Sequence, residues 1–246
     1  MYNFFVDKNN FKDGFFNVSG ADFNHIKNVL RLKVGDNVLI CSDGVNNLCS
    51  IDSFSSDTVM LKVLQENYMD TALPITVTLF QGLPKSDKME LIIQKAVELG
   101  ADKIVPIEME RCVVKLDGKK KDGKTSRWQA IAESAAKQSK RTSIPTVESP
   151  LNFEEMLKKA QTCDVFLVPY ENKDGMSATA SALNKIKRGN SVGVLIGPEG
   201  GFSEKEIERA TAIGGIPVSL GRRILRTETA AITALSMIML HAEINL

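Results

Sequence analysis

A glycine-rich turn after an apolar strand is the clearest candidate for chemistry in this sequence. Residues 195–206 read Leu-Ile-Gly-Pro-Glu-Gly-Gly-Phe-Ser-Glu-Lys-Glu, which predicts a buried strand ending at Gly197 and a helix beginning with a capping box of Ser203 and Glu206. Ligands of α/β proteins bind beyond the carboxyl ends of strands, and glycines let them approach the main chain. The spacing is neither GxGxxG nor GxxxxGK[ST], which disfavours a dinucleotide or a triphosphate. Local signals alone also fit a plain strand-to-helix turn.

A second turn of the same kind covers residues 220–231, which read Leu-Gly-Arg-Arg-Ile-Leu-Arg-Thr-Glu-Thr-Ala-Ala. The pattern predicts a strand that ends at Gly221 and a helix capped by Thr227 or Thr229. We expect the two turns to follow adjacent strands, to form two walls of one pocket, and to attract a polyanion through the three arginines. Arg226, just before the cap, is the best placed of these for ligand contact, whereas surface solubility explains the other two equally well.

The elements that position these turns change character after residue 72. Up to that point, short strands separated by turn residues, with one helix at 21–31, predict a small β-barrel. Beyond it, strands alternate with helices, which predicts a parallel sheet covered on both faces. The lysine-rich run 119–124 is expected to be an exposed loop. The expected strands are 75–80, 103–107, 164–168, 192–196 and 216–220, and the expected helices are 86–99, 127–140, 153–160, 178–186, 204–213 and 228–242.

Composition excludes several classes of protein. The chain has 246 residues, 43% of them hydrophobic, and 31 Lys+Arg against 30 Asp+Glu, as in ordinary globular proteins. The apolar run 230–240 is too short to span a bilayer, and no secretory signal is visible. The 4 cysteines lack CxxC spacing, so we expect neither a metal site nor disulfides, and a cytoplasmic location. Basic residues gather at 115–127, 137–141 and 222–226, where they either bind phosphates or form solvated surface.

Four groups of residues occur in a specific order along nearly the whole chain. They are His25-x-x-x-Val29-Leu30-Arg31-x-x-x-Gly35-Asp36; Gln81-Gly82-x-Pro84-Lys85-x-Asp87-Lys88-x-Glu90; Glu133-x-x-x-x-Gln138-Ser139-x-Arg141; and Gly197-Pro198-Glu199-Gly200-Gly201-Phe202 with Leu220-Gly221-x-x-Ile224-Leu225-Arg226-x-Glu228-Thr229-Ala230. Together they resemble the RsmE family of 16S ribosomal RNA uracil-N3 methyltransferases, which are of the SPOUT class.

The resemblance implies a fold and an activity. The expected fold is α/β, with a PUA-like RNA-binding β-barrel at 1–72 and a trefoil-knotted SPOUT methyltransferase domain at 73–246. The expected activity is methylation of N3 of a specific uridine in 16S rRNA, within the small ribosomal subunit, by S-adenosylmethionine and without a metal. The family's homodimers would bury Ile232, Leu235, Ile238 and Met239 of the final helix, although an ordinary core helix explains the same residues.

The chemistry of the implied reaction points to site residues. Arg226 would stabilise the uracil anion that forms as N3 loses its proton. Glu199 would accept a hydrogen bond or act as a base, although a structural role fits a loop carboxylate near a helix start equally well. The residues expected at the cofactor are Val168, Leu195, Ile196, Gly197, Pro198, Glu199, Gly200, Gly201, Leu220, Gly221, Ile224, Leu225, Arg226, Thr227, Thr229 and Ala230. Those expected at the RNA are His25, Arg31, Lys85, Lys88, Lys137, Lys140, Arg141 and Arg223.

Three other functions compete with this interpretation. A transfer-RNA ribose 2′-O-methyltransferase is disfavoured by the order of the two domains and by the string from Ile224 to Ala230. A non-catalytic RNA-binding or ribosome-assembly module would not need both glycine turns. A small-molecule α/β enzyme would leave the separate barrel and the basic clusters without a role.

Overall fold

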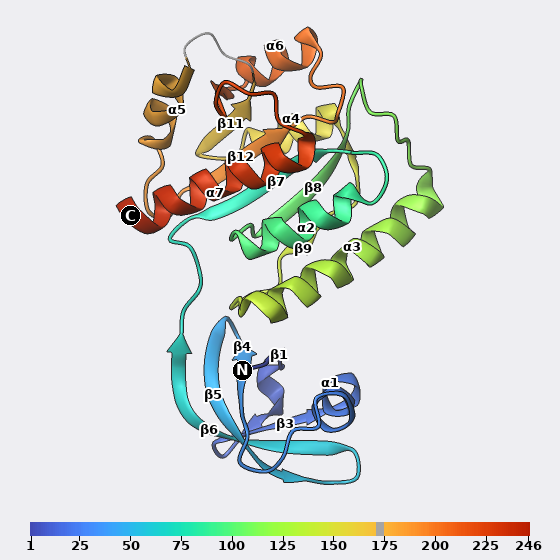
Figure 1. The fold of residues 1–246 in the computed structure, drawn as a ribbon, viewed down its shortest axis with the longest axis vertical. Helices are drawn as coiled ribbons and strands as arrows, with labels where there is room; N and C mark the ends of the chain where they lie inside the picture. The colour runs from blue at the N-terminus through green and yellow to red at the C-terminus, as the bar shows by residue number, and fades with distance from the viewer. Residues whose placement is uncertain (171–174) are drawn as a thin grey trace. The chain divides into compact units, whose positions relative to one another are not determined.

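The computed structural model describes residues 1–170 and 175–246, which form two compact units (Figure 1). The first unit contains residues 1–72 together with residues 136–144. The second contains residues 73–135 and 145–246. The segment 136–144 is therefore part of the N-terminal unit, although it follows the first strands and helices of the second unit in the sequence.

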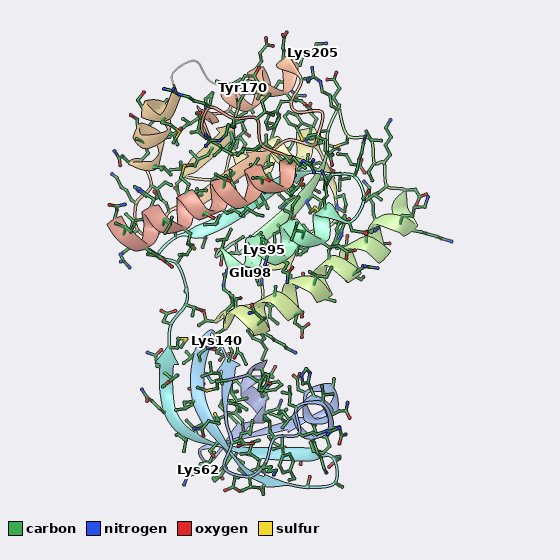
Figure 2. All side chains as sticks on the ribbon, in the orientation of Figure 1. Lys62, Lys95, Glu98, Lys140, Tyr170 and Lys205 are labelled. Atoms are coloured by element: carbon green, nitrogen blue, oxygen red, sulfur yellow. The ribbon has the colours of Figure 1, made fainter. Side chains whose placement is uncertain are left out.

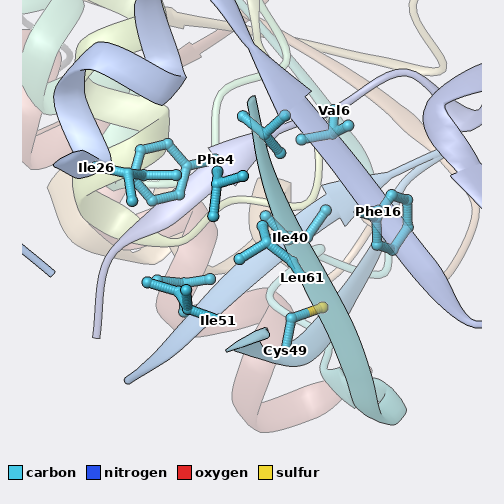
Figure 3. Packing of buried hydrophobic residues seen from close by; sticks show 11 residues of the cluster. Phe4, Val6, Phe16, Ile26, Ile40, Cys49, Ile51 and Leu61 are labelled. Carbon is cyan, nitrogen blue, oxygen red and sulfur yellow. The ribbon is translucent and has the colours of Figure 1, made fainter. Parts of the chain in front are cut away.

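A curled six-stranded sheet forms most of the first unit. Its order is β1 (Asn3–Phe5), β4 (Asn37–Ser42), β5 (Val45–Phe54), β6 (Thr58–Met69), β3 (Phe15–Ser19) and β2 (Phe11–Lys12). Within residues 1–72 the end strands β1 and β2 do not pair with each other, so the sheet is a half-barrel rather than the closed barrel that the sequence predicts. Side chains alternate between its faces, and Phe16, Ile40 and Leu61 lie in a shared apolar core (Figure 3).

The helix expected at 21–31 is divided in two. A short α-helix, α1 (Gly20–Asn24), continues into a π-helical turn, η2 (His25–Val29). Ile26 is fully buried and anchors the turn on the sheet. The chain then leaves the helix at Arg31, whose φ of 53° lies in the left-handed region.

A parallel sheet forms the centre of the second unit. Within its described residues the order is β10 (Leu151–Asn152), β8 (Lys103–Glu108), β7 (Thr76–Gly82), β12 (Ser191–Ile196), β11 (Val165–Pro169) and β13 (Ile216–Val218), with β9 (Thr146–Val147) paired to β8. The apolar strand β12 is central, as the sequence predicts. However, β11 separates β12 from β13, so the prediction that the two glycine turns follow adjacent strands is wrong.

The helices of this part of the chain lie close to the predicted positions, except that the helix expected at 127–140 begins well before residue 127. They are α2 (Lys88–Glu98), α3 (Gly118–Ser139), α4 (Phe153–Ala160), α5 (Gly175–Leu183), α6 (Glu204–Ala212) and α7 (Thr227–Asn245). Helices α2 and α7 lie side by side, and α7 also packs on β12 (Figure 1). Among the described residues, no helix is long and apolar enough to cross a membrane.

One prediction about these helices is wrong, and one is decided between its two alternatives in part. The run 119–124 is part of α3 and not a loop, because the Asp117 carboxylate accepts the backbone N–H of Lys120 at 3.1 Å and lysine favours helices. On α7, Leu235 and Ile238 are buried within this chain at 1% and 0% exposure, as the alternative of an ordinary core helix expects, whereas Ile232 and Met239 are half-buried.

Candidate functional site

The glycine turn after β12 is held by the capping box that the sequence predicts. The Ser203 hydroxyl accepts the Glu206 backbone N–H at 3.4 Å, and the Glu206 carboxylate accepts that of Ser203 at 2.9 Å. The other oxygen of Glu206 accepts the N–H of Glu110 at 2.9 Å, which ties the start of α6 to the segment after β8. Gly200 packs so closely on that segment that a Cβ there would lie 2.9 Å from the Cβ of Arg111.

Side-chain hydrogen bonds join this turn to the ends of two other elements. The Thr227 hydroxyl donates to the carbonyl oxygen of Gly197 at 2.7 Å and accepts from Gln81 Nε2 at 2.9 Å. Gln81 Nε2 also donates to the carbonyl oxygen of Gly82 at 2.9 Å. We call the three residues Gln81, Thr227 and Gly197 the clasp. It brings together the end of β7, the end of β12 and the start of α7.

The clasp corrects the expected cap of α7. The N-cap residue is Arg226, whose guanidinium has no acceptor with which to cap the helix, while the Thr227 hydroxyl is engaged at Gly197. Sequence reasoning gave no role to Gln81 or Gly82, although both lie in one of the four motifs. A Cβ on Gly82 would lie 2.7 Å from the nitrogen and the Cδ of Pro198, so glycine is required for this contact.

Glu199, on the glycine turn, is held by a backbone N–H and by an ammonium group from the segment after β7. Its carboxylate accepts the backbone N–H of Lys85 at 3.1 and 3.3 Å, and the Lys88 ammonium lies 3.2 Å away. Lys88 also pairs with Glu228 on α7 at 3.1 Å. The two carboxylates, Glu228 first, raise the pKa of Lys88. Desolvation raises the pKa of Glu199, but its hydrogen bonds to backbone N–H groups and to Lys88 outweigh it and leave that pKa lowered.

The ends of β11 and β13 complete the edge of the sheet. Tyr170, just after β11 (Figure 2), donates its N–H to Val218 at 3.0 Å and meets Phe202 edge-on at 6.4 Å between ring centroids. After β13, Gly221 takes a φ of 107° that favours glycine. Ile224 then projects into solvent at 95% exposure, which leaves a large apolar side chain for a ligand to cover.

The expected cofactor residues therefore lie at the carboxyl ends of β11, β12 and β13 and on the first turn of α7. Those on strands, Val168, Leu195 and Ile196, are buried. The loop residues Glu199, Gly200, Arg226 and Thr229 are exposed. The side chain of Arg226 makes no hydrogen bond or ion pair with any residue that the structure describes.

The residues expected at the RNA differ in their surroundings. Arg141 is buried at 4% exposure in the first unit. The ammonium groups of Lys88 and Lys137 are engaged by carboxylates, in the second case by Asp22 at 3.1 Å. Of the other residues expected at the RNA, four are exposed, namely His25, Arg31, Lys85 and Arg223, and Lys140 is half-buried.

The cavity of about 520 Å³ in the second unit lies away from this edge of the sheet. Its lining includes Asp164 and Val165, where β11 begins, and Ile216, where β13 begins. It therefore opens near the amino ends of the strands and includes none of the expected cofactor residues. Among the described residues, no cluster of three or more His, Cys, Asp or Glu side chains is arranged to hold a metal ion.

Known proteins resemble the chain over almost its full length. A family model described as an RNA methyltransferase domain matches residues 71–239, and one described as an RNA methyltransferase PUA domain matches residues 18–51. A ribosomal RNA small subunit methyltransferase E of Bacillus subtilis (strain 168) is 42% identical over 233 residues, which cover 93% of this chain and 91% of the relative.

A relative with the same description from Mesomycoplasma hyopneumoniae (strain 232) is 31% identical and is matched over 96% of this chain and 98% of its own length. Among solved structures, a ribosomal RNA small subunit methyltransferase E from Neisseria gonorrhoeae, bound to S-adenosyl methionine, superposes with a TM-score of 0.80. It has 31% identity over 97% of this chain and 96% of that one. A Legionella pneumophila putative methyltransferase with bound cofactor superposes at 0.81, with 29% identity over the same shares.

Proposed function

The chain belongs to the ribosomal RNA small subunit methyltransferase E family, and from this premise we propose that it transfers a methyl group from S-adenosylmethionine to N3 of a specific uridine in 16S rRNA. The substrate would be the rRNA of the small ribosomal subunit, in the cytoplasm. The RNA methyltransferase activity follows from the family. The atom that is methylated and the state of the substrate are the parts proposed here.

The observation that carries the proposal is the clasp. It gathers the glycine turn after β12, the end of β7 and the start of α7 at the carboxyl edge of a parallel sheet, where ligands of such sheets bind. The buried Oε1 of Gln81 has no hydrogen-bond partner in the described chain, which leaves an acceptor at the centre of this arrangement. A methyl donor whose amino group or hydroxyls can donate a hydrogen bond to this oxygen fits such a site.

S-adenosylmethionine, when bound, supplies a methyl group on a sulfonium that is ready for in-line displacement. Residues of this chain would hold it as follows. Backbone groups of Gly197–Gly201 and Leu220–Gly221 bind its polar atoms, and the side chains of Ile224 and Leu225 cover its apolar surface. Binding thus positions the reactants, which is the main help that this reaction needs.

The nucleophile needs further help because uracil N3 carries a proton. As that proton leaves, negative charge develops on the two uracil oxygens, and a nearby cation stabilises it. Arg226 is exposed at the N-terminus of α7, where the positive end of the helix dipole adds to its charge. Glu199 has a lowered pKa, so its carboxylate is a weak base. Because it accepts the backbone N–H of Lys85 and pairs with Lys88, we assign it to ordering the glycine turn against the segment after β7.

The knot and the homodimer are part of the same proposal. The chain passes from the edge strand β13 back to the central turn, where Thr227 bonds Gly197, as a threaded C-terminal segment would. Leu240 and Ile244 of α7 are 50% and 75% exposed and would be covered by a second copy. Sedimentation should give twice the chain mass of 27.0 kDa, and stretching a knotted chain from both ends should give less than its full contour length.

Calorimetric titration with S-adenosylmethionine, with ATP and NAD as controls, tests the donor site. Small subunits from a strain that lacks this modification are then incubated with labelled donor, and digested rRNA is analysed for N3-methyluridine. We expect selective donor binding and one methyl group per subunit on N3. Methyl transfer to a ribose or to another base would reject the N3 assignment. Failure to bind the donor even in the presence of subunits would reject the enzyme and favour an assembly factor.

A further inference from the structure

A second, smaller cavity of about 210 Å³ lies beside the candidate site, wholly within the second unit. Its apolar lining comes from Leu83 and Pro84 after β7, from Val114 and Leu116 after β8, and from Trp128 of α3. A nucleobase is flat and apolar on its faces, and a slot lined by aliphatic and aromatic side chains is suited to hold one that has left the stack.

The cavity shares a loop with the proposed donor site. Gly82, two residues before Pro84, packs on Pro198, and the backbone N–H of Lys85, directly after Pro84, donates to Glu199 at 3.1 Å. One side of the segment 82–87 therefore contacts the glycine turn, while the other side lines the cavity. A base held there would place its strand next to the transferred methyl group.

Three polar side chains in the lining make no hydrogen bond or ion pair within the described chain: Ser86, Asp87 and Lys124. The fourth polar residue, Glu90, is already paired with Arg127 at 2.8 Å. Ser86 has a φ of 57°, an unfavourable conformation for serine, and it lines the cavity.

The chemistry of these groups selects a class of base. Lys124 and Ser86 donate hydrogen bonds, and the Asp87 carboxylate accepts one. The Watson–Crick edge of uracil offers two acceptors and one donor, and so does that of cytosine. Guanine offers one acceptor and two donors, which leaves a donor of the protein without a partner. Two donors and one acceptor on the protein therefore favour a pyrimidine.

Basic residues near the lining residues in the sequence can bind the phosphate groups of the same RNA strand. Lys115, between two lining residues, and Lys119 are exposed and make no ion pair in the described chain. Lys120 and Lys121 of the same cluster are engaged by carboxylates at 3.1 and 2.9 Å. The basic run 115–127, noted in the sequence without an assigned role, thus leaves cations free to bind a backbone beside the slot.

We propose that this cavity binds an unstacked pyrimidine base of the substrate RNA, with Ser86, Asp87 and Lys124 at its polar edge and Trp128 in its wall. The proposal rests on the proposed function for the identity of the polymer. It adds a recognition site that is separate from the donor site.

The single tryptophan makes the site directly observable. Trp128 gives the one indole N–H signal of the 246-residue chain in a ¹⁵N-correlated NMR spectrum, and it lines the cavity. Titration of the full protein with uridine and cytidine 5′-monophosphates should shift this signal saturably below about 10 mM. Adenosine and guanosine monophosphates should bind at least about fivefold more weakly. A signal unmoved by either pyrimidine, or equal or tighter purine binding, overturns the proposal.

Variants link the signal to the cavity. Val114→Phe fills the slot and should abolish the shift, while Lys124→Met should raise the dissociation constant about tenfold by removing a charged donor. Val113→Phe is the matched control, because Val113 is 68% exposed and does not line the cavity. Val114→Phe with wild-type nucleotide binding and wild-type KM for the small subunit overturns the proposal.

Donor binding separates this inference from the proposed function. All three variants should bind S-adenosylmethionine as the wild-type protein does and keep its melting temperature. Pyrimidine binding without any donor binding would reject the methyltransferase assignment and leave the cavity as a base site. Methyl transfer without a pyrimidine-induced shift of the Trp128 signal would reject the base site in the cavity and leave the methyltransferase assignment in place.

Discussion

At the scale of single residues, Arg226 and Glu199 differ sharply although we propose both for the edge of the donor site. Glu199 is held by the N–H of Lys85 and by the Lys88 ammonium, so its charge is already matched. Arg226 is exposed, and its side chain has no partner among the described residues. A charge without a partner is available to a substrate, whereas a matched charge holds structure. Arg226 is therefore the stronger candidate for contact with the reacting base.

Replacement of Arg226 by alanine tests this difference. We expect Arg226→Ala to lower kcat by about 100-fold or more, because the developing charge on uracil loses its cation. Donor affinity measured by calorimetry should stay within about tenfold of wild type. Arg222→Ala is the matched control, since Arg222 is exposed on the same loop and has no assigned role. A wild-type kcat for Arg226→Ala would remove this residue from the mechanism.

The pKa of Glu199 makes a prediction about stability. A carboxyl whose folded pKa is lowered stabilises the fold above its unfolded pKa and loses that effect as the pH falls through the folded value. Glu199→Gln lacks this contribution at every pH. The variant should therefore melt below wild type at pH 7, and the gap in melting temperature should close as the pH falls through the lowered pKa of Glu199 in the folded protein. A gap in melting temperature that does not change with pH would show that the negative charge of Glu199 does not contribute to stability and that its hydrogen bonds alone do.

At the scale of elements, close packing between the ends of β7 and β12 predicts sensitivity at Gly82. A Cβ there meets the backbone of Pro198, which cannot move aside as a flexible side chain would. Gly82→Ala should cost about 1–3 kcal/mol in unfolding free energy and should weaken donor binding, because the turn after β12 is displaced. Both are measurable, by denaturant unfolding and by calorimetry.

Gly123 provides the control for that substitution. It lies inside α3, and an added Cβ meets nothing within 4 Å. Gly123→Ala should stabilise the protein by about 0.5–1 kcal/mol through helix propensity and leave donor binding unchanged. If both alanines had the same effect, the close contact at Pro198 would not be what constrains Gly82.

Local sequence patterns predict the individual helices and strands of this chain better than they predict which of these elements lie side by side in the fold. The apolar run of β12 and the capping box of Ser203 are short-range signals, and both are confirmed. The sequence does not predict the helical start of α3, because glycine, aspartate and clustered lysines also favour loops and the cap at Asp117 is a single residue. The clasp could not be predicted, because Gln81 and Thr227 are brought together only by the order of strands that are distant in the sequence.

At the scale of the whole molecule, the segment 136–144 belongs to the N-terminal unit through its backbone. Asn46 and Thr71 donate to the carbonyl oxygen of Lys140 at 3.1 and 3.0 Å, and the Cys41 thiol donates to that of Thr142 at 3.0 Å. Lys140 has a φ of 58° at this point. These bonds, together with the burial of Arg141, give the segment a structural role in the first unit.

The prediction at this scale separates structural from RNA-binding basic residues. Arg141→Ala should lower the unfolding free energy by about 1–3 kcal/mol, because a large side chain that is 4% exposed is lost from the first unit. Lys119→Ala, at an exposed position, should change stability by less than about 0.5 kcal/mol but reduce the salt slope of RNA binding by about one. Thermal unfolding measures the stabilities, and filter binding at several salt concentrations measures the salt slopes. The reverse pattern would show that Arg141 binds RNA and has no structural role.

The composition of the first unit has a consequence for synthesis. A nascent chain that has emerged only to residue 72 has all six strands of the curled sheet, but the side-chain donors of Cys41, Asn46 and Thr71 still lack their carbonyl partners. Those carbonyls emerge only after β7, α2, β8 and α3 have been translated. Completion of the N-terminal unit therefore awaits translation of residues 73–135, the first segment of the second unit.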